Sequence, residues 1–265
     1  QMGQRDQLGP VIQALSQIGF ADVMEVSLGA DMVALAESEE FAQRVPKETG
    51  YLLSSCCPSF VKMVKEYAPM QAQNISSVVS PMIALAISVK KDNPEAKIVF
   101  IGPCISKKRE AMESGVVDAV LTFEELAALF VAAEVNLATI EAQEDYKASG
   151  SKDGQNFAGA GGVNKAMVKG MARFPEVHFV GKNAQGIKEC QDDLKALAQG
   201  QASFNFLEGM ACSGGCLGGP GALVDERKTK RFMELRGESL SCQNLQENSL
   251  AQTRLAVIGK SIHTN

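Results

Sequence analysis

The sequence predicts an α/β protein with two lobes of mainly parallel sheet flanked by helices. Short apolar runs typical of buried strands alternate with longer segments of helical periodicity. Three of these runs are each followed by a turn that carries cysteines, and ligands of open α/β sheets bind at the carboxyl ends of strands. We expect a first lobe over residues 1–145 and a second over 146–265, because the polar stretch Gln143 to Gln155 contains two glycines. The site is expected between the lobes.

Composition excludes several classes of protein. The 265 residues are 45% hydrophobic, which is enough for a large core and excludes a disordered chain. The net charge of −5, with no cluster of Lys and Arg interleaved with aromatics, argues against nucleic-acid binding. No apolar run reaches membrane-spanning length and no signal peptide is evident, so we expect a cytoplasmic protein. Seven cysteines, an odd number, favour thiols kept reduced for metal binding or chemistry.

The first fifty residues or so are predicted to form a helix, a strand and a second helix. Apolar side chains recur at helical spacing over Pro10 to Ile18 and Asp31 to Arg44, and Asp22 to Leu28 between them is strand-like. Three charged residues of the second helix share one face: Glu37, Glu40 and Arg44. Spacing alone favours a solvated face with a weak ion pair for this trio.

A turn with two adjacent cysteines comes next. Tyr51 to Leu53 is predicted to be a short buried strand, and a helix is predicted from Pro58 to Tyr67 because proline suits the first helical position. Cys56 and Cys57 lie between them, and Cys57 is near the helix N-terminus, where the dipole favours a thiolate. Neighbouring side chains diverge, so one cysteine is expected to bind metal and the other to act differently. Two simply buried cysteines are the alternative.

A second cysteine turn follows the predicted strand Lys97 to Ile101. A helix from Pro81 to Lys90 precedes this strand, and a helix from Arg109 to Ser114 comes after the turn. Cys104 therefore lies at the carboxyl end of a strand, where a site is expected. Lys107 follows it closely, and a cation beside a cluster can stabilise thiolates or bind an anionic ligand.

The same patterns predict the remaining elements. Strands are predicted at Val116 to Leu121, Val177 to Val180 and Ala202 to Leu207. Helices are predicted at Phe123 to Val135 after a Thr122 N-cap, from the glycine run Phe157 to Val163 onward to Arg173, at Gly186 to Ala198 and at Leu245 to Ile258.

The stretch Glu208 to Ala222 carries the third cysteine motif. Cys212 and Cys216 are separated by three residues, with six glycines around them. Glycine lets the backbone approach a bulky ligand and reach positive φ without strain. Two thiolates on such a loop suit an iron–sulfur cluster or zinc, whereas a glycine-rich turn with two packed cysteines is the alternative.

Taken together, the motifs supply four thiols on three turns that each follow a strand: Cys57, Cys104, Cys212 and Cys216. Four soft ligands match the thiolate complement of a 4Fe-4S cluster. The paired C-x-x-C knuckles of a compact zinc site are missing. The sequence therefore favours iron–sulfur over zinc.

The three motifs, S-C-C-P, P-C-x-x-K and E-x-M-A-C-x-x-G-C, resemble the signatures of the catalytic domain of FeFe-hydrogenases, in the same order, between Gly29 and Gly221. The resemblance implies an H-cluster. In it a 4Fe-4S cluster is bound by the four cysteines, and Cys216 also bridges to a two-iron subsite with CO, cyanide and a dithiolate bridge. Cys56 matches the proton-donating cysteine of the family, Lys107 the lysine that hydrogen-bonds a cyanide, and Met210 the methionine beside the subsite.

Further site residues follow from the same resemblance. It implies cofactor contacts from Ser80, Pro81, Pro103, Phe157 and Ala158. It also implies a proton path from Cys56 through Glu37, Ser76, Glu40 and Arg44 toward solvent, which replaces the solvated-face interpretation of the helical trio. The family has an upstream segment that touches the two-iron subsite, and Gln1 begins after it, so we expect another segment to complete the pocket.

The resemblance implies an anaerobic oxidoreductase that interconverts H2 with protons and electrons. It would use an electron carrier such as ferredoxin, or an iron–sulfur domain or subunit, and would depend on maturation proteins. Gly102 and Met82 stand where well-studied members have methionine and glutamine, which leaves a slow-turnover H2-sensing relative as one alternative. A non-catalytic iron–sulfur assembly protein is the other, although a carrier has no use for the proton donor Cys56.

Overall fold

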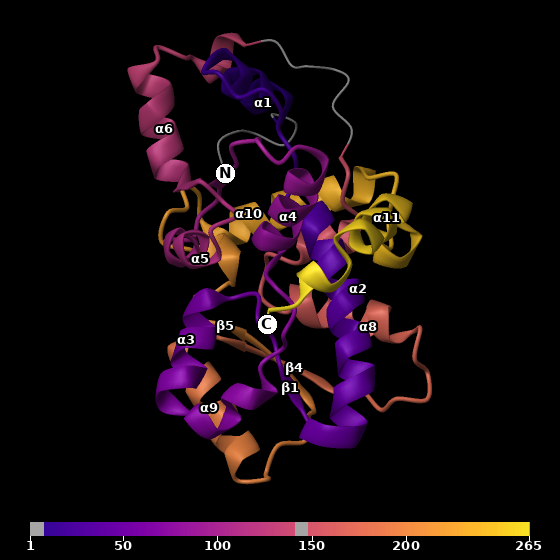
Figure 1. Ribbon diagram of the computed structural model, residues 1–265. Coiled ribbons are helices and arrows are strands. Elements are labelled where there is room, and N and C mark those ends of the chain that lie inside the picture. Colours follow the sequence, from indigo (N-terminus) through magenta and orange to yellow (C-terminus); the bar gives the residue numbers. More distant parts are fainter. Residues whose placement is uncertain (1–7, 141–147, 265) are drawn as a thin grey trace.

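The computed structural model describes residues 8–140 and 148–264, and its helices surround two small parallel sheets (Figure 1). The helices are α1 (Leu8–Gln17), α2 (Ser27–Arg44), α3 (Pro58–Tyr67), α4 (Pro81–Asp92), α5 (Ser106–Ser114), α6 (Phe123–Ala132), α7 (Lys152–Asn156), α8 (Gly162–Met171), α9 (Gly186–Ala198), α10 (Glu226–Ser239) and α11 (Ser249–Ile258). The strands are β1 (Leu52–Leu53), β2 (Val99–Ile101), β3 (Ala119–Leu121), β4 (Gly181–Gln185) and β5 (Phe206–Met210). The predicted α/β class with parallel sheets is confirmed. The predicted lobe boundary falls within 141–147, outside the described residues.

The larger sheet has the order β1-β5-β4, with every pair parallel. Successive side chains of a strand point to opposite faces, and the core follows this rule. Leu52 and Phe206 pack with side chains of α2 and α8, whereas Leu53 and Leu207 pack with side chains of α3 and α9 (Figure 1). The carboxyl ends of β1 and β5 lie side by side, so the chain leaves both strands at the same edge of the sheet.

The smaller sheet pairs β2 with β3, and α4 and α5 pack against it. Its strand β2 ends at Ile101 and leads into the Cys104 turn. The predicted capping of α6 is confirmed: Thr122 and Glu125 form a reciprocal capping box. Among the described helices, none combines the length and the apolar character that a membrane span requires.

Helix α2 is the central element of the fold, because α4, α7, α8 and α11 all pack against it. Most of its side chains are buried, including Glu37, which is fully buried, and Glu40, which is 6% exposed. A solvated face for Glu37 and Glu40 is therefore ruled out by packing. A helix surrounded on all sides is normally apolar, so buried carboxylates on it need an explanation.

The strands predicted from Tyr51, Lys97 and Val116 begin one to three residues later than predicted, and three other strand predictions are wrong or shifted further. The run from Asp22 to Leu28 is a loop that leads into the first turn of α2, and its apolar side chains pack on the core without pairing to a strand. Residues 177–180 form no strand; the strand is the polar segment β4, which lies at an edge of the sheet and needs no apolar run. The third, β5, starts at Phe206 rather than Ala202 and continues to Met210, because its backbone pairs with β4 as far as that residue. Helix α7, within the polar stretch, was not predicted.

Candidate functional site

The four cysteines predicted to bind a cluster lie on three turns that meet at one place. Cys57 is the N-cap of α3, Cys104 follows β2, and Cys212 and Cys216 follow β5. Burial raises the pKa of Cys216 to about 12, and the nearby thiols of Cys57, Cys104 and Cys212 contribute in the same direction. Burial also raises the pKa of Cys212, again with Cys57 and Cys104 contributing. The thiols of Cys57 and Cys104 thus lie within electrostatic reach of both Cys212 and Cys216.

Backbone contacts hold the C-x3-C loop against the glycine turn before α8. The Cys216 N–H donates to the Ala158 carbonyl over 2.8 Å, and Gly159 forms a β-bridge with Gly215. Gly215 has φ +69°, and a Cβ placed there would lie 2.6 Å from the Met210 sulfur. Only glycine fits this position. The loop therefore forms a tight cradle beside the thiols, with Met210 and Ala158 at its wall.

Glu208 fixes the other side of the same turn. Its buried carboxylate accepts hydrogen bonds of 2.7 Å from the Gly161 and Asn164 N–H groups at the N-terminus of α8. Burial raises the pKa of Glu208 to about 7, although these hydrogen bonds act in the opposite direction. The sequence motif contains Glu208, but its capping role was not predicted. An acidic residue inside an otherwise apolar strand was the available signal.

The Cys104 turn is tied to the other two turns. The Pro103 carbonyl accepts a hydrogen bond of 2.9 Å from the Gly221 N–H, just beyond the C-x3-C loop. The hydroxyls of Ser59 and Ser106 are hydrogen-bonded, which joins the first turn of α3 to the first turn of α5. The geometry among the turns is thus set by direct contacts between segments that are distant in the chain.

Lys107 directs a buried cation toward the thiols. Its Nζ donates to Glu110 over 2.6 Å and to the Cys56 carbonyl over 3.2 Å. Burial by itself would lower the pKa of Lys107. Glu110 and the thiols of Cys216 and Cys56 have a larger effect in the opposite direction, so the pKa of Lys107 is raised. Lys108 instead pairs with Glu125, as a surface charge would.

The remaining residues predicted to contact the cofactor are buried around the cysteines or on neighbouring elements. Met210 and Phe157 belong to the main core, and Ser80 is the N-cap of α4. The Ser80 hydroxyl is buried and makes no hydrogen bond to any described residue, which is unusual for a buried polar group. Pro81 follows it at the first helical position, and its carbonyl lies so close to Gly29 that a Cβ there would be 2.3 Å away.

Cys56 and Glu37 form the inner end of the predicted proton path. Burial raises the pKa of the Cys56 thiol well above its usual value, and Glu37 is the next contributor, so the carboxyl lies within electrostatic reach of the thiol. Burial is the main cause that raises the pKa of Glu37 to about 8, and the nearby carboxylate of Glu40 is the second cause. The Ser76 hydroxyl acts in the opposite direction and lowers this pKa. Neither oxygen of Glu37 has hydrogen-bond geometry with a described residue. Glu37 is therefore held mainly in its protonated form at neutral pH.

Ser76, Glu40 and Arg44 continue the path toward the surface. The Ser76 hydroxyl donates to Glu40 over 2.6 Å, and the Arg44 guanidinium pairs with the same carboxylate. Burial opposes ionisation of Glu40, but hydrogen bonds from Ser76, Ser77 and Arg44 outweigh it and lower its pKa.

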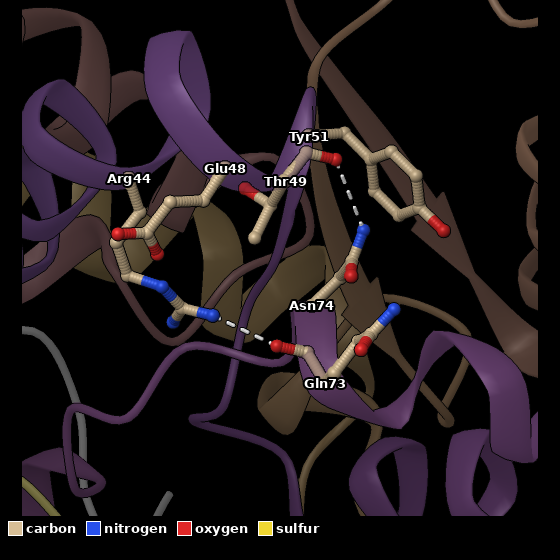
Figure 2. A pocket seen from close by; sticks show the side chains of 6 residues that line it. All are labelled: Arg44, Glu48, Thr49, Tyr51, Gln73 and Asn74. Atoms are coloured by element: carbon tan, nitrogen blue, oxygen red, sulfur yellow. Dashed lines mark hydrogen bonds between the residues drawn. The ribbon is translucent and has the colours of Figure 1, made fainter.

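Arg44 opens onto a polar pocket of about 440 Å³. Its guanidinium donates to the Gln73 carbonyl over 2.8 Å, as Figure 2 shows. The other residues that line the pocket are Glu48, Thr49, Tyr51 and Asn74. Arg44, the last residue of the predicted path, is thus the one that lines this pocket.

The donor set fits a multi-iron cluster better than a single ion. Among the described residues, no three or more His, Cys, Asp or Glu side chains are close enough together to hold one metal ion. A zinc site needs all its ligands on one ion, whereas each cysteine of a 4Fe-4S cluster binds a different iron. The four thiols, on three neighbouring turns next to a glycine cradle, have the ligand type and number that a 4Fe-4S cluster requires.

Comparison with known proteins places the chain among hydrogenase-related domains. Residues 1–220 match the family model described as the C-terminal domain of the iron-only hydrogenase large subunit. The chain is 30% identical to iron hydrogenase 1 of Clostridium pasteurianum over 261 residues, which cover 82% of this chain and 46% of that protein. It is 24% identical to the cytosolic Fe-S cluster assembly factor narfl of Xenopus tropicalis, over 84% of this chain and 59% of that protein. The chain thus spans about half the length of these curated relatives.

The fold is similar to that of a solved FeFe-hydrogenase from Chlamydomonas reinhardtii. The TM-score is 0.73 at 19% identity, with 92% of this chain and 82% of that chain covered. At this identity the likeness is one of fold, while the family match covers most of the sequence. The chain belongs to the family formed by the C-terminal domains of iron-only hydrogenase large subunits, a family that implies iron–sulfur cluster binding.

Proposed function

We propose that this chain catalyses the reversible interconversion of H2 with protons and electrons at an H-cluster. One observation carries the proposal: a buried series of proton-carrying groups leads from Cys56, beside the four thiols, to the pocket at Arg44. Chemistry on H2 at a buried metal needs a base beside the metal and a route for the proton to solvent. A protein that only carries a cluster needs neither.

Four thiols would hold the 4Fe-4S part of the cofactor: Cys57, Cys104, Cys212 and Cys216. Cys216 would also bridge to the two-iron subsite with its CO, cyanide and dithiolate ligands. When bound, this cofactor supplies the metal centre at which H2 is formed or split. The protein supplies the surroundings, with Lys107 as the nearby cation and with contacts from Met210, Ser80, Pro81, Pro103, Phe157 and Ala158.

The chain's own residues would move the proton. Cys56 is next to a ligand in sequence and near Glu37 in space, so its sulfur is the first carrier. Glu37 makes no fixed hydrogen bond to a described residue, so its carboxyl is free to exchange a proton with Cys56 on one side and Ser76 on the other. Ser76 then exchanges with Glu40, to which it is already hydrogen-bonded. From Glu40 the proton reaches water in the pocket at Arg44.

Electrons would come from a carrier such as ferredoxin, or from an iron–sulfur domain or subunit. Maturation proteins would deliver the two-iron subsite. The two-lobe division near residue 145, the anaerobic setting and the cytoplasmic location stay predictions.

An infrared spectrum of the anaerobic, matured protein, combined with an H2 turnover assay, tests the proposal. We expect bands from metal-bound CO and cyanide together with turnover. A matured sample with neither would refute the proposed function. In Cys56→Ser we expect the infrared bands to persist while turnover is nearly lost; loss of the cluster would instead make Cys56 a ligand.

An iron–sulfur assembly factor is the second candidate, because such factors from Xenopus tropicalis and Candida dubliniensis are among the relatives. It predicts a 4Fe-4S cluster with no CO or cyanide bands and no turnover. A slow H2-sensing relative is the third. A Cβ on Gly102 would lie 2.7 Å from the Phe100 ring, so Phe100 fills the space that a methionine would need there. The test therefore uses Met82→Gln without a substitution at Gly102, and no gain in turnover would leave the sensing proposal without support.

A further inference from the structure

A largely buried ion pair on helix α5 holds Lys107 in place beside the cysteines. The Lys107 Nζ donates to the Glu110 carboxylate over 2.6 Å, and the two side chains are 9% and 19% exposed. The same Nζ donates to the Cys56 carbonyl over 3.2 Å. Lys107 therefore reaches from α5 to the turn with the two adjacent cysteines, and Glu110 holds it at the α5 side. The sequence motif of this turn ends at Lys107 and assigns no role to Glu110.

The local helix disfavours a cation at position 107. Helix α5 begins at Ser106, so Lys107 lies in its first turn, where the helix dipole favours negative charge. In helical ion pairs the better order has the acid before the base, and Lys107 and Glu110 have the reverse order. Burial of a lysine also costs free energy unless its charge is paired. Glu110 therefore offsets the cost of a cation that neither helix formation nor burial would favour.

An exposed ion pair on the same helix provides the contrast. Arg109 and Glu113 are 2.6 Å apart, with side chains that are 65% and 61% exposed. Such a pair contributes little, because water solvates either partner when the other is removed. Removal of one partner from a buried pair instead leaves an unpaired charge in the interior. Loss of Glu110 should therefore displace Lys107, whereas loss of Glu113 should leave Lys107 in place.

We propose that Glu110 is a positioning residue, which holds the Lys107 ammonium beside the cluster thiols with one N–H left for an anionic ligand of the cofactor. The inference rests on the proposed function and adds a residue to its site. An ammonium has three N–H groups. Glu110 and the Cys56 carbonyl accept from two of them, and Lys107 makes no third hydrogen bond to a described residue. Two acceptors restrict a long, flexible side chain, so the third N–H keeps one direction.

Amine labelling of the cofactor-free protein tests the position of Lys107. Acetic anhydride reacts with the free amine and not with an ammonium held in an ion pair, and mass spectrometry gives the labelling rate of each lysine. We expect Glu110→Ala to raise the rate of Lys107 several-fold. Glu110→Gln keeps an uncharged acceptor and should raise the rate less. Glu113→Ala is the matched control and should leave the rate unchanged.

The labelling rate of Lys108 reports on folding in the same samples. Lys108 pairs with Glu125 at the surface, so its rate should be the same in the wild type and in every variant. If Glu110→Ala does not fold, the comparison of Glu110→Gln with the wild type decides. Equal rates for Lys107 in the wild type and in the folded Glu110 variants would overturn the inference.

The second arm uses the matured enzyme. We expect Glu110→Ala to shift the infrared bands of cyanide and to lower H2 turnover about tenfold, with a smaller change in Glu110→Gln and none in Glu113→Ala. A merely structural role would lower the yield of matured protein without shifting these bands, so unshifted cyanide bands in Glu110→Ala would overturn the inference. Absence of the bands in the wild type would instead refute the proposed function, and the labelling rates would still decide whether Glu110 positions Lys107.

Discussion

The variant Glu37→Gln tests, in the cofactor-free protein, whether burial of the Glu37 carboxyl lowers the free energy of unfolding at neutral pH. Glu37 is fully buried, and burial together with Glu40 raises its pKa from 4.5 to about 8. The unfolded chain keeps the ordinary value, so between these two pH values the folded protein holds a proton that the unfolded chain has released. The free energy of unfolding then falls by about 1.4 kcal/mol for each pH unit. Over the roughly 2.5 pH units from 4.5 to 7, Glu37 should cost about 3 kcal/mol.

Glutamine has the shape of a protonated glutamate and does not titrate, so the variant should escape this cost. We expect urea unfolding of the cofactor-free protein to give similar stabilities at pH 4.5, and Glu37→Gln to be about 3 kcal/mol more stable than the wild type at pH 7. The control is Glu39→Gln, an exposed position on the same helix. Other buried acids such as Glu208 titrate in all three proteins, so the difference isolates Glu37. Parallel pH profiles for the wild type and Glu37→Gln would refute the reasoning.

Three further predictions concern Glu37, the cysteines and the glycine cradle. Glu37→Gln should also reduce H2 turnover of the matured enzyme by roughly a hundredfold or more, with unchanged infrared bands, because glutamine cannot carry the proton; an unchanged rate would contradict the path. Cys212→Ala should abolish the iron–sulfur absorbance while Cys242→Ala retains it, and equal iron content in the two variants would contradict the assignment of Cys212 as a ligand. Gly215→Ala should lower the unfolding temperature more than Gly186→Ala, because both glycines have positive φ but only Gly215 would place a Cβ against neighbouring atoms; equal losses would show that the cradle is not tight.

Much of the fold could be predicted because local signals and packing agree. Proline at the first position sets the start of α3, and the apolar stripe of α9 sets both of its ends, so these helices match the prediction. Strand β4 could not be predicted, because a polar edge strand is defined by its pairing to β5 rather than by its own side chains. The run from Asp22 to Leu28 was wrongly predicted to be a strand, because its apolar side chains are partly buried although no strand lies beside it.

The site residues can likewise be divided into those that the sequence indicates and those whose contacts only the structure reveals. The cysteines are marked by motifs and Glu37, Glu40 and Arg44 by their position on one helix, whereas Ser76 was predicted only from the family resemblance. The contacts of Glu208, and that between Ser77 and His263, join distant segments, and Ser77 and His263 are separated by 186 positions in the chain. Neither their residue types nor their spacing indicates such a contact. Only the folded structure brings the C-terminal end to Ser77.

The three buried carboxylates of α2 differ in how well they are hydrogen-bonded, and this difference is what the proposed function would require of a structural and a proton-carrying carboxylate. Asp31 accepts bonds of 2.6 to 2.7 Å from the Ser151 N–H and hydroxyl and from Asn248, which join α2 to distant segments. Glu40 accepts from Ser76, Ser77 and Arg44. Glu37 accepts none from the described residues, although it is the most deeply buried of the three. A well-bonded carboxylate is held in one place, whereas an unbonded one can turn between two partners. Burial of such a group lowers folding stability, and under the proposed function its position near Cys56 and Ser76 would serve proton transfer, so its cost in folding stability can be measured beside its effect on turnover.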